Sequence, residues 1–232
     1  MKARKVKKLD PAGTLADNAA RIVLVRVDEL RSFADDALDP GASETQHAMR
    51  IAAKRLRYVL EATGFCFGRS AVTARRQTKD LQDLLGEIHD CDVMLPRVAD
   101  HRRALRLADA EAVYRRAGRD PDLDLKLAAR APHRTSYRGL DVLEVYLRAR
   151  RTVLFDRFTE LWAESEERGV WRNLVASAER EIARAAEMRR AAERAERARL
   201  ALEDAERERR EAAERAQRAE VELADAEADA DR

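Results

Sequence analysis

The 232-residue sequence is poor in aromatic side chains, glycine and proline. Aromatic residues make up 5% of the chain, and it contains only 8 glycines and 5 prolines. The alternating β-branched runs that are typical of strands are also absent. These shortages argue against a β-sandwich or an α/β sheet. Together with 39% charged residues, they predict an all-α protein built from long, alanine-rich helices.

Long apolar runs are missing as well. No stretch approaches the roughly 20 consecutive apolar residues of a transmembrane helix. The basic start at residues 1–8 is not followed by the apolar run of a signal peptide. Two cysteines, Cys66 and Cys91, lie in separate predicted helices without the spacing of metal ligands. We therefore expect a cytoplasmic protein without membrane contact, metal site or cofactor.

The charge of the chain is balanced overall but unevenly distributed. The formal net charge is +2. Residues 1–175 carry 33 Lys and Arg against 27 Asp and Glu, whereas residues 176–232 carry 13 against 17. The body is thus basic and the tail acidic. The excess in the body is too small to indicate general nucleic-acid binding, so an anion site must come from local clustering.

Breaker residues and changes in composition divide the chain into three parts. We expect a basic, flexible lead over residues 1–12, a compact helical domain over 13–175 and an extended helix rich in Ala, Glu and Arg over 176–232. Hydrophobic periodicity predicts these helices within the domain: 14–38, 45–64, 70–89, 92–118 and 139–167. Asp120-Pro121 is expected to end the fourth, at the start of a basic connector over 119–138. The tail lacks a sustained apolar heptad, which favours a solitary charged helix over a tight coiled coil.

The predicted helix over 45–64 has one apolar face and one cationic face. At 100° per residue, five side chains fall within about a third of the helix circumference. They are His47, Arg50, Lys54, Arg57 and Tyr58. The apolar residues of the opposite face can be buried in a core. The cationic face then holds fixed positive charge, which needs an anion or many water molecules.

The next predicted helix repeats this design, because Arg75 and Lys79 share a face that is separate from its leucine-rich stripe. Three further arginines fall on or beside the apolar stripes of other helices. They are Arg26, Arg148 and Arg151. A buried arginine is costly unless it is paired or faces a water-filled cavity. These three therefore either join an anion site or pair with carboxylates such as Glu29 and Glu144 inside the bundle.

Two segments carry a resemblance to a known family. The first, HAMRIAAKRLRYVLE, contains a histidine, an arginine three residues later and a Lys-Arg-Leu-Arg cluster, which are His47, Arg50 and residues 54–57. The second, LQDLLGEIHDCDVML, contains a Leu-Gly motif at Leu85 and Gly86, which is followed by an aspartate at Asp90. In this order and spacing the two segments resemble the CHAD family, the conserved histidine α-helical domain. The segment YLRARRTVLFDRF resembles a later helix of such domains, so the resemblance extends over about residues 13–175.

The resemblance implies a helical bundle that binds inorganic polyphosphate through basic side chains lining a cavity, and that is not an enzyme. The residues that it would place there are His47, Arg50, Lys54, Arg57, Tyr58, Arg75, Lys79, Arg26, Arg148 and Arg151. Members of the family commonly contain two copies of a four-helix unit, whereas this chain has one clear histidine motif. Either the remaining helices complete a smaller basin, or two chains complete it together as a homo-oligomer. Polyphosphate binding would also place the protein on polyphosphate granules.

Other classes of function compete with this interpretation. The tail could act as a structural scaffold through self-association, or the basic faces could bind nucleic acid without sequence preference. Nucleic acid is disfavoured because the basic faces have little aromatic interleaving for base stacking and no helix-turn-helix is recognisable. Catalysis is disfavoured too. The dipeptide His89-Asp90 superficially resembles a metal-binding pair of phosphohydrolases, but the other histidines do not complete a metal site and no Gly-rich phosphate loop is present.

Overall fold

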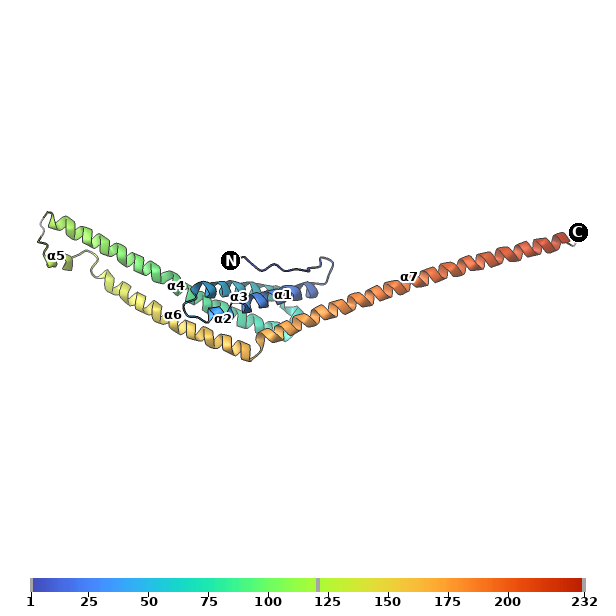
Figure 1. Cartoon of the computed structure of the whole chain (residues 1–232), viewed down its shortest axis with the longest axis horizontal. Coiled ribbons are helices and arrows are strands. Elements are labelled where there is room, and N and C mark those ends of the chain that lie inside the picture. Colours follow the sequence, from blue (N-terminus) through green and yellow to red (C-terminus); the bar gives the residue numbers. More distant parts are fainter. Residues whose placement is uncertain (1, 120–121, 231–232) are drawn as a thin grey trace. The chain divides into compact units, whose positions relative to one another are not determined.

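The computed structural model of the chain describes residues 2–119 and 122–230, and for residues 220–230 it describes the backbone only. The helix stop predicted at Asp120-Pro121 therefore lies outside the described residues. Every regular element in the described ranges is helical, which confirms the all-α prediction (Figure 1). The chain divides after Ile182 into two units.

The first unit begins with a short helix pair and a cationic helix. Helix α1 spans Leu15–Arg31, α2 spans Ala34–Ala37 and α3 spans Ser43–Thr63. The single helix predicted over 14–38 is therefore interrupted. The interruption lies at Ser32, whose hydroxyl donates to the carbonyl oxygen of Glu29 at 2.9 Å. This local bond offers the backbone an alternative to the continued helix, as serine side chains often do.

A single long helix follows where the sequence predicted two. After a 3-10 turn at Gly64–Phe67, helix α4 runs from Gly68 to Ala117 and includes Pro96. Proline in a helix interior costs about 3 kcal/mol or more, because it removes a hydrogen bond and crowds the preceding turn. The helix continues because Cys91 and Val98, on either side of Pro96, are both buried against the core. Packing therefore overrides the local breaker.

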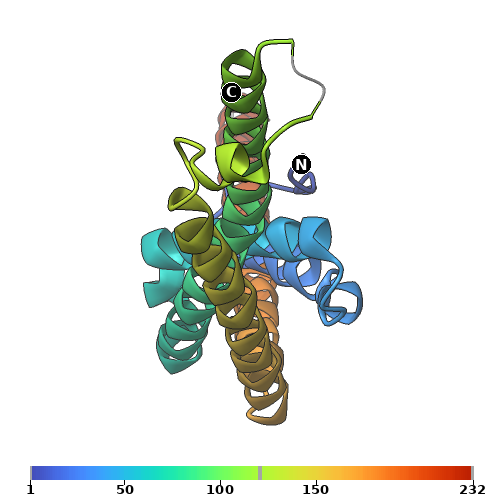
Figure 2. The ribbon, with the colours of Figure 1, turned by 90° about the vertical axis from the view of Figure 1, so that its left-hand side faces the viewer.

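The second half of the first unit returns along α4. A five-residue helix, α5 (Leu125–Ala129), lies within the predicted connector, and α6 (Ser136–Glu167) leads to the start of α7 (Val170–Ala230). Helix α4 packs against both α3 and α6, and α3 also packs against α1, an arrangement that can be followed in Figures 1 and 2. This sandwiched position of α4 brings its cationic face next to that of α3.

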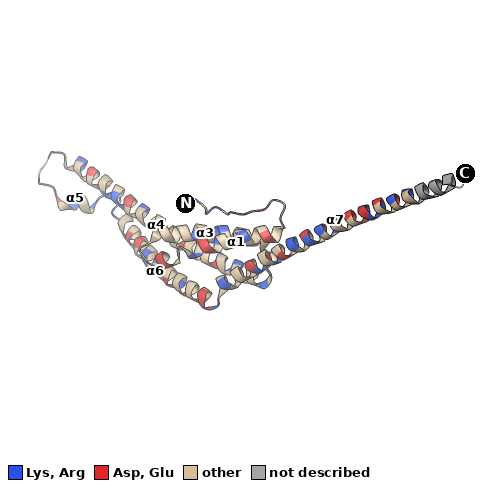
Figure 3. Ribbon diagram, turned by 45° about the vertical axis from the view of Figure 1, so that its right-hand side comes forward, with Lys and Arg blue, Asp and Glu red and all other residues tan. Residues whose placement is uncertain are grey.

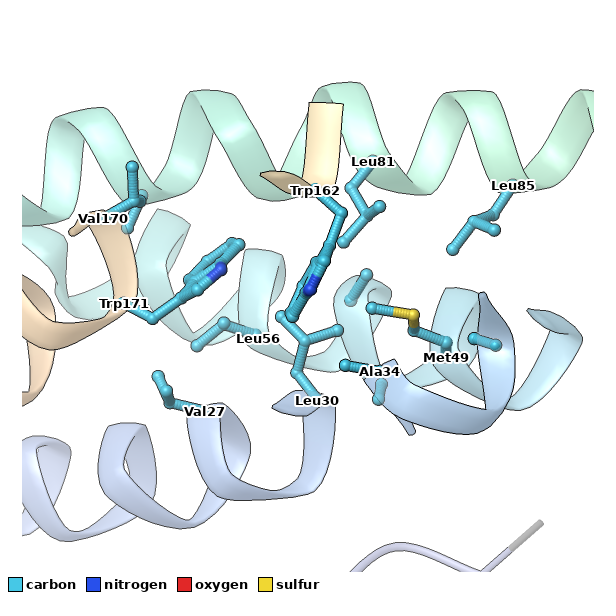
Figure 4. Close-up of a cluster of buried hydrophobic side chains, with 14 of the residues drawn as sticks. Val27, Leu30, Ala34, Met49, Leu56, Leu81, Leu85, Trp162, Val170 and Trp171 are labelled. Atoms are coloured by element: carbon cyan, nitrogen blue, oxygen red, sulfur yellow. The ribbon is translucent and has the colours of Figure 1, made fainter. Parts of the chain in front are cut away.

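The core of the first unit is formed by side chains from α1, α3, α4, α6 and the start of α7 (Figure 4). Trp162 and Trp171 stack with their ring centroids 5.8 Å apart. On α1 the buried line passes through Val23 and Val27, whereas Ile22, four residues before Arg26, is only partly buried. Arg26 consequently lies at the edge of the core rather than at its centre.

The lead before α1 contacts the bundle through Arg4. Its guanidinium donates to the Ser32 hydroxyl at 2.7 Å and also contacts the carboxylate of Asp28. The carbonyl oxygen of Arg4 accepts a hydrogen bond from Nη2 of Arg26 at 2.7 Å. These contacts attach this part of the lead to α1.

The second unit, from residue 183 onward, consists of the remainder of α7. Basic and acidic residues alternate along its described part (Figure 3), with ion pairs such as Arg199 to Glu196 and Arg207 to Asp204, both at 2.8 Å. Such pairs three or four residues apart each stabilise a helix by about 0.2–0.5 kcal/mol. No helix in the ranges that the structure describes has the length and apolar character needed to cross a membrane.

Candidate functional site

The cationic side of α3 lies against α4. The His47 ring packs on the His89 ring of α4 with their centroids 4.2 Å apart. The Arg50 side chain crosses Gly86, where an added Cβ would lie 3.2 Å from Arg50 Nε. The structure thus joins the two predicted motifs into one surface. We call it the α3–α4 cationic face and define it as His47, Arg50, Lys54, Arg57, Tyr58, Lys79, Gln82, Gly86 and His89.

Tyr58 lies between two cations of this face. The Lys54 ammonium is 5.8 Å from the centre of the Tyr58 ring, and the Arg57 guanidinium carbon is 5.0 Å from it. Aromatic faces attract cations at such distances, so the ring helps to hold both side chains in place. About half of Tyr58 is exposed, which leaves its hydroxyl accessible to a ligand.

Lys79 extends the face from α3 onto α4. Its ammonium nitrogen lies 2.6 Å from a carboxylate oxygen of Asp83, and this hydrogen bond raises the pKa of Lys79. The positive charge of nearby Arg57 acts in the opposite direction. Arg57 itself has Glu61 within 3.5 Å. These two carboxylates moderate the repulsion within the cluster at its end near Arg57.

Several polar atoms of the face are buried without a partner. Among the described residues, nothing hydrogen-bonds to Nδ1 of His47, Nε of Arg50 or Nε of Arg57. Nor does any carboxylate of the described part of the chain form an ion pair with Arg50 or Lys54. A buried polar group left unpaired costs about 1–3 kcal/mol, and more if it is charged. The face therefore presents donors that an anionic acceptor would satisfy.

The electrostatic surroundings disfavour a charged His47. Burial lowers the pKa of His47, and the neighbouring His89 and Arg50 lower it further. His47 is thus neutral near pH 7 in the free protein. A bound anion would reverse this balance, because it would neutralise the cations around the ring and accept a hydrogen bond from the imidazolium.

Anion binding should therefore depend on pH through His47. We expect affinity for a polyanion to rise as the pH falls through about 6.5, because the bound state takes up a proton that the free state resists. Without ligand the same lowered pKa should make the folded state lose stability as the pH falls below the unfolded value. Titration calorimetry in buffers of different ionisation enthalpy would measure the proton uptake. His47→Gln should reduce it, whereas His101→Gln, an exposed control on α4, should not.

Gly86 offers a test in which stability and binding move in opposite directions. Replacing a helical glycine by alanine stabilises a helix by up to about 1 kcal/mol. At Gly86 the new methyl would meet Arg50 Nε at 3.2 Å and shift its guanidinium. We expect Gly86→Ala to raise the melting temperature or leave it unchanged, while anion affinity falls several-fold. Gly139→Ala on α6, where the methyl would meet no atom within 4 Å, should bind normally, and equal binding by both variants would remove Arg50 from the site.

Two hollows extend the basic surface beyond the residues that were predicted. The first, of about 790 Å³, is lined by Arg75 and Lys79 and also by Arg76 and Arg168, together with three acidic side chains. It shares Arg168 with a second hollow of about 440 Å³, which has no acidic residue in its lining. The residues that line this second hollow are Phe67, Arg69, Ser70, Thr73, Arg168, Val170, Asn173, Ala176, Ser177 and Arg180.

Sequence reasoning missed four arginines that line these hollows: Arg69, Arg76, Arg168 and Arg180. Arg69 and Arg76 are seven residues apart on α4, so helical periodicity could have placed them on one side of the helix. Arg168 and Arg180 belong to the turn after α6 and to α7, and only tertiary packing brings them to α4. No local sequence pattern indicates that Arg168 and Arg180 lie near α4.

Arg26 is not part of the α3–α4 cationic face. Its guanidinium contacts the buried carboxylate of Glu29, three residues later on α1. The same carboxylate accepts a hydrogen bond from Arg55 Nη1 at 2.7 Å. Arg55 is the α3 cation that lies outside the cationic arc of the helix. Glu29 is thus a buried anion shared by two arginines, and both cations are already paired within the bundle.

Arg148 and Arg151 are also paired with carboxylates. Arg151 Nε lies 2.5 Å from a carboxylate oxygen of Asp92, and its Nη2 donates to Gln46 at 3.0 Å. Arg148 Nη2 donates to Glu144 at 2.8 Å. The structure therefore brings together the predicted residues of α3 and α4 and leaves the arginines of α1 and α6 in separate ion pairs. In the described ranges, no group of three or more His, Cys, Asp or Glu side chains could hold a metal ion.

Comparison with known proteins identifies one family. Residues 2–99 match the family model of the CHAD domain. This range contains the lead, α1, α2, α3 and the part of α4 that carries Lys79, Gln82, Gly86 and His89, whereas α6 and α7 lie outside it. No curated protein and no solved structure matched the chain. The matched range contains both motifs and the whole α3–α4 cationic face, and this match supports a CHAD family protein.

Proposed function

We propose that the α3–α4 cationic face binds inorganic polyphosphate. The observation that carries the proposal is a set of buried nitrogen atoms without hydrogen-bond partners: Nδ1 of His47, Nε of Arg50 and Nε of Arg57, the last of which lies 3.5 Å from a Glu61 carboxylate oxygen. Phosphate oxygens are strong acceptors, and hydrogen bonds between charged partners are roughly twice as strong as neutral ones. A phosphate group within reach of these donors would satisfy them and neutralise their charge.

A linear polyanion suits the face better than a single small anion. The cations of α3 extend from His47 to Arg57, over about 15 Å at 1.5 Å per residue. Lys79 continues the row on α4, and the hollow lined by Arg75 lies beyond it. Polyphosphate carries about one negative charge per phosphate, so successive phosphates can contact successive cations. Arginine gives bidentate bonds to phosphate oxygens, whereas lysine contributes a compact charge that tolerates sliding.

The helical framework favours binding because its donors are fixed before the ligand arrives. Arg50 is packed over Gly86 and Arg57 over Tyr58, so little side-chain freedom is lost on binding. The role that we propose is binding alone, with no catalytic residue assigned. Retention of a cytoplasmic protein on polyphosphate granules would follow from it, since a granule presents many phosphate chains.

Competition between polyanions tests the proposal. The full-length protein is titrated with long-chain polyphosphate, and duplex DNA of equal phosphate concentration is added as competitor. We expect polyphosphate to bind in the presence of DNA and its affinity to fall steeply with salt, by analogy with counterion release from nucleic acids. Displacement by DNA at equal phosphate would instead indicate a general polyanion surface. Affinity that does not change with salt would contradict charge neutralisation as the mechanism.

A further inference from the structure

The outward side of α6 carries an apolar stripe that nothing in the described chain covers. Val142, Val145 and Val153 are 62%, 68% and 59% exposed, and Ala149 between them is exposed as well. Their spacing of three or four residues places them on one side of the helix. The opposite side, which includes Leu147, Leu154 and Phe158, is buried in the core. Helix α6 thus has two apolar faces, of which only one is used within the chain.

We propose that two copies of the chain pair through this outward face, with their α6 helices antiparallel and crossing at Ala149. A two-fold axis at Ala149 sets the register of every other residue. Val145 then lies opposite Val153 of the partner subunit, and Arg138 lies opposite Glu160 of the partner subunit. The contact is isologous, so each of these pairs occurs twice.

The charges at the two ends of the stripe select this orientation. Arg138 and Glu160 are both exposed, and in the described part of the chain neither forms an ion pair. They are about 33 Å apart along the same helix, so they cannot pair within one chain. An antiparallel partner brings them together at both ends, whereas a parallel partner would place arginine on arginine and glutamate on glutamate. Electrostatic complementarity of this kind sets register and orientation more than raw affinity.

The remaining charges near the crossing point do not oppose the contact. Arg148 and Arg150 would approach each other across the axis, but Arg148 is paired with Glu144 and Arg150 with Glu87. Their charges are therefore largely compensated before the copies meet.

The shape of the face fits the same register. Ala149 has a small side chain, which lets two helix backbones approach closely at the crossing point. A shallow hollow next to it is lined by Arg138, Asp141, Val142 and Val145. In the proposed register Val153 of the partner subunit lies at one end of this hollow, opposite Val145, and Asp156 of the partner subunit lies opposite Val142. The proposal uses residues outside the α3–α4 cationic face, so it does not depend on the ligand of that face.

Disulfide trapping of the full-length protein tests the register. In a Cys66→Ala/Cys91→Ala background, Ala149→Cys should form a disulfide-linked dimer on mild oxidation, because the two sulfurs meet at the axis. The matched control is Ala163→Cys, an exposed alanine two heptads further along the same side of α6. Its two copies would be about 40 Å apart in the antiparallel pair and should remain monomeric on a non-reducing gel. Equal cross-linking of both variants, or of neither, would overturn the proposal.

Charge reversal provides an independent readout that does not require cysteine. Sedimentation analysis of the native chain should show a monomer–dimer equilibrium. Arg138→Glu and Glu160→Arg should each shift it towards the monomer, and the double variant should restore the dimer. Helical circular dichroism of each variant confirms that it is folded. Failure of the double variant to recover association, with each single variant folded, would exclude the antiparallel pairing.

Discussion

The full-length protein with Arg50, Lys54 and Arg57 replaced by glutamine is expected to lose about a thousandfold in polyphosphate affinity. A hydrogen bond to a charged group contributes about 1.5–3 kcal/mol, so three lost contacts exceed about 4 kcal/mol even at the lower value. The logarithmic salt dependence should also become shallower by about two or three units, one for each phosphate contact that is lost. Binding isotherms at several salt concentrations measure both quantities.

The matched control removes the same charge from another part of the domain. Arg103, Arg115 and Arg116 are exposed on the distal part of α4, away from the residues that contact α3. Their replacement by glutamine lowers the net charge equally and should reduce affinity only slightly. If both triple variants lose affinity to the same extent, the overall field of the domain governs binding and the α3–α4 cationic face is not a site.

The cationic face of α3 could be predicted because it depends on local geometry. Side chains at spacings of three and four residues share a side of any regular helix, whatever surrounds it. His47, Arg50, Lys54 and Arg57 occupy one α-helix in the structure, and the motif around Gly86 lies on the helix beside it. The two-motif resemblance to the CHAD family was confirmed over residues 2–99 for the same reason, since both motifs are short and continuous.

The partners of the inward arginines could not be chosen from the sequence. An arginine in an apolar stripe predicts that something compensates its charge, but a ligand and a carboxylate satisfy that need equally well. Asp92 is 59 residues from Arg151 in the chain and belongs to another helix. Only the packing of α6 against α4 brings them together.

Element boundaries failed where packing competed with local signals. The sequence placed a helix end near His89, but α4 continues through Pro96 because buried side chains on both sides anchor it. Conversely, α1 ends at Arg31, where the sequence pattern predicted continuity. At Pro96 burial in the core decided the outcome, whereas at Ser32 a local bond from the side chain to the backbone accompanies the interruption.

Glu29 is a buried charge that joins several parts of the bundle. It is fully buried and contacts the guanidinium groups of Arg26 on α1 and Arg55 on α3, as well as the backbone amide of Arg4. Removing one member of a buried ion pair is far more costly than the net contribution of the pair, because a desolvated charge is left without compensation. Here two guanidinium groups would lose their shared partner at once.

Glu29→Gln is therefore expected to lower the free energy of unfolding by about 3–5 kcal/mol while leaving the shape of the side chain almost unchanged. Urea denaturation followed by circular dichroism measures the change. The control is Asp28→Asn, which neutralises the adjacent, exposed carboxylate and breaks its ion pair with Arg4. Exposed pairs contribute little, so this variant should unfold close to the native midpoint.

At temperatures where Glu29→Gln is still folded, this variant should bind polyphosphate normally. The Arg26–Glu29–Arg55 network holds α1 to α3, whereas the ligand donors lie on the side of α3 that faces α4. Unchanged stability, or weakened binding by folded Glu29→Gln, would place Arg26 back among the ligand-binding residues.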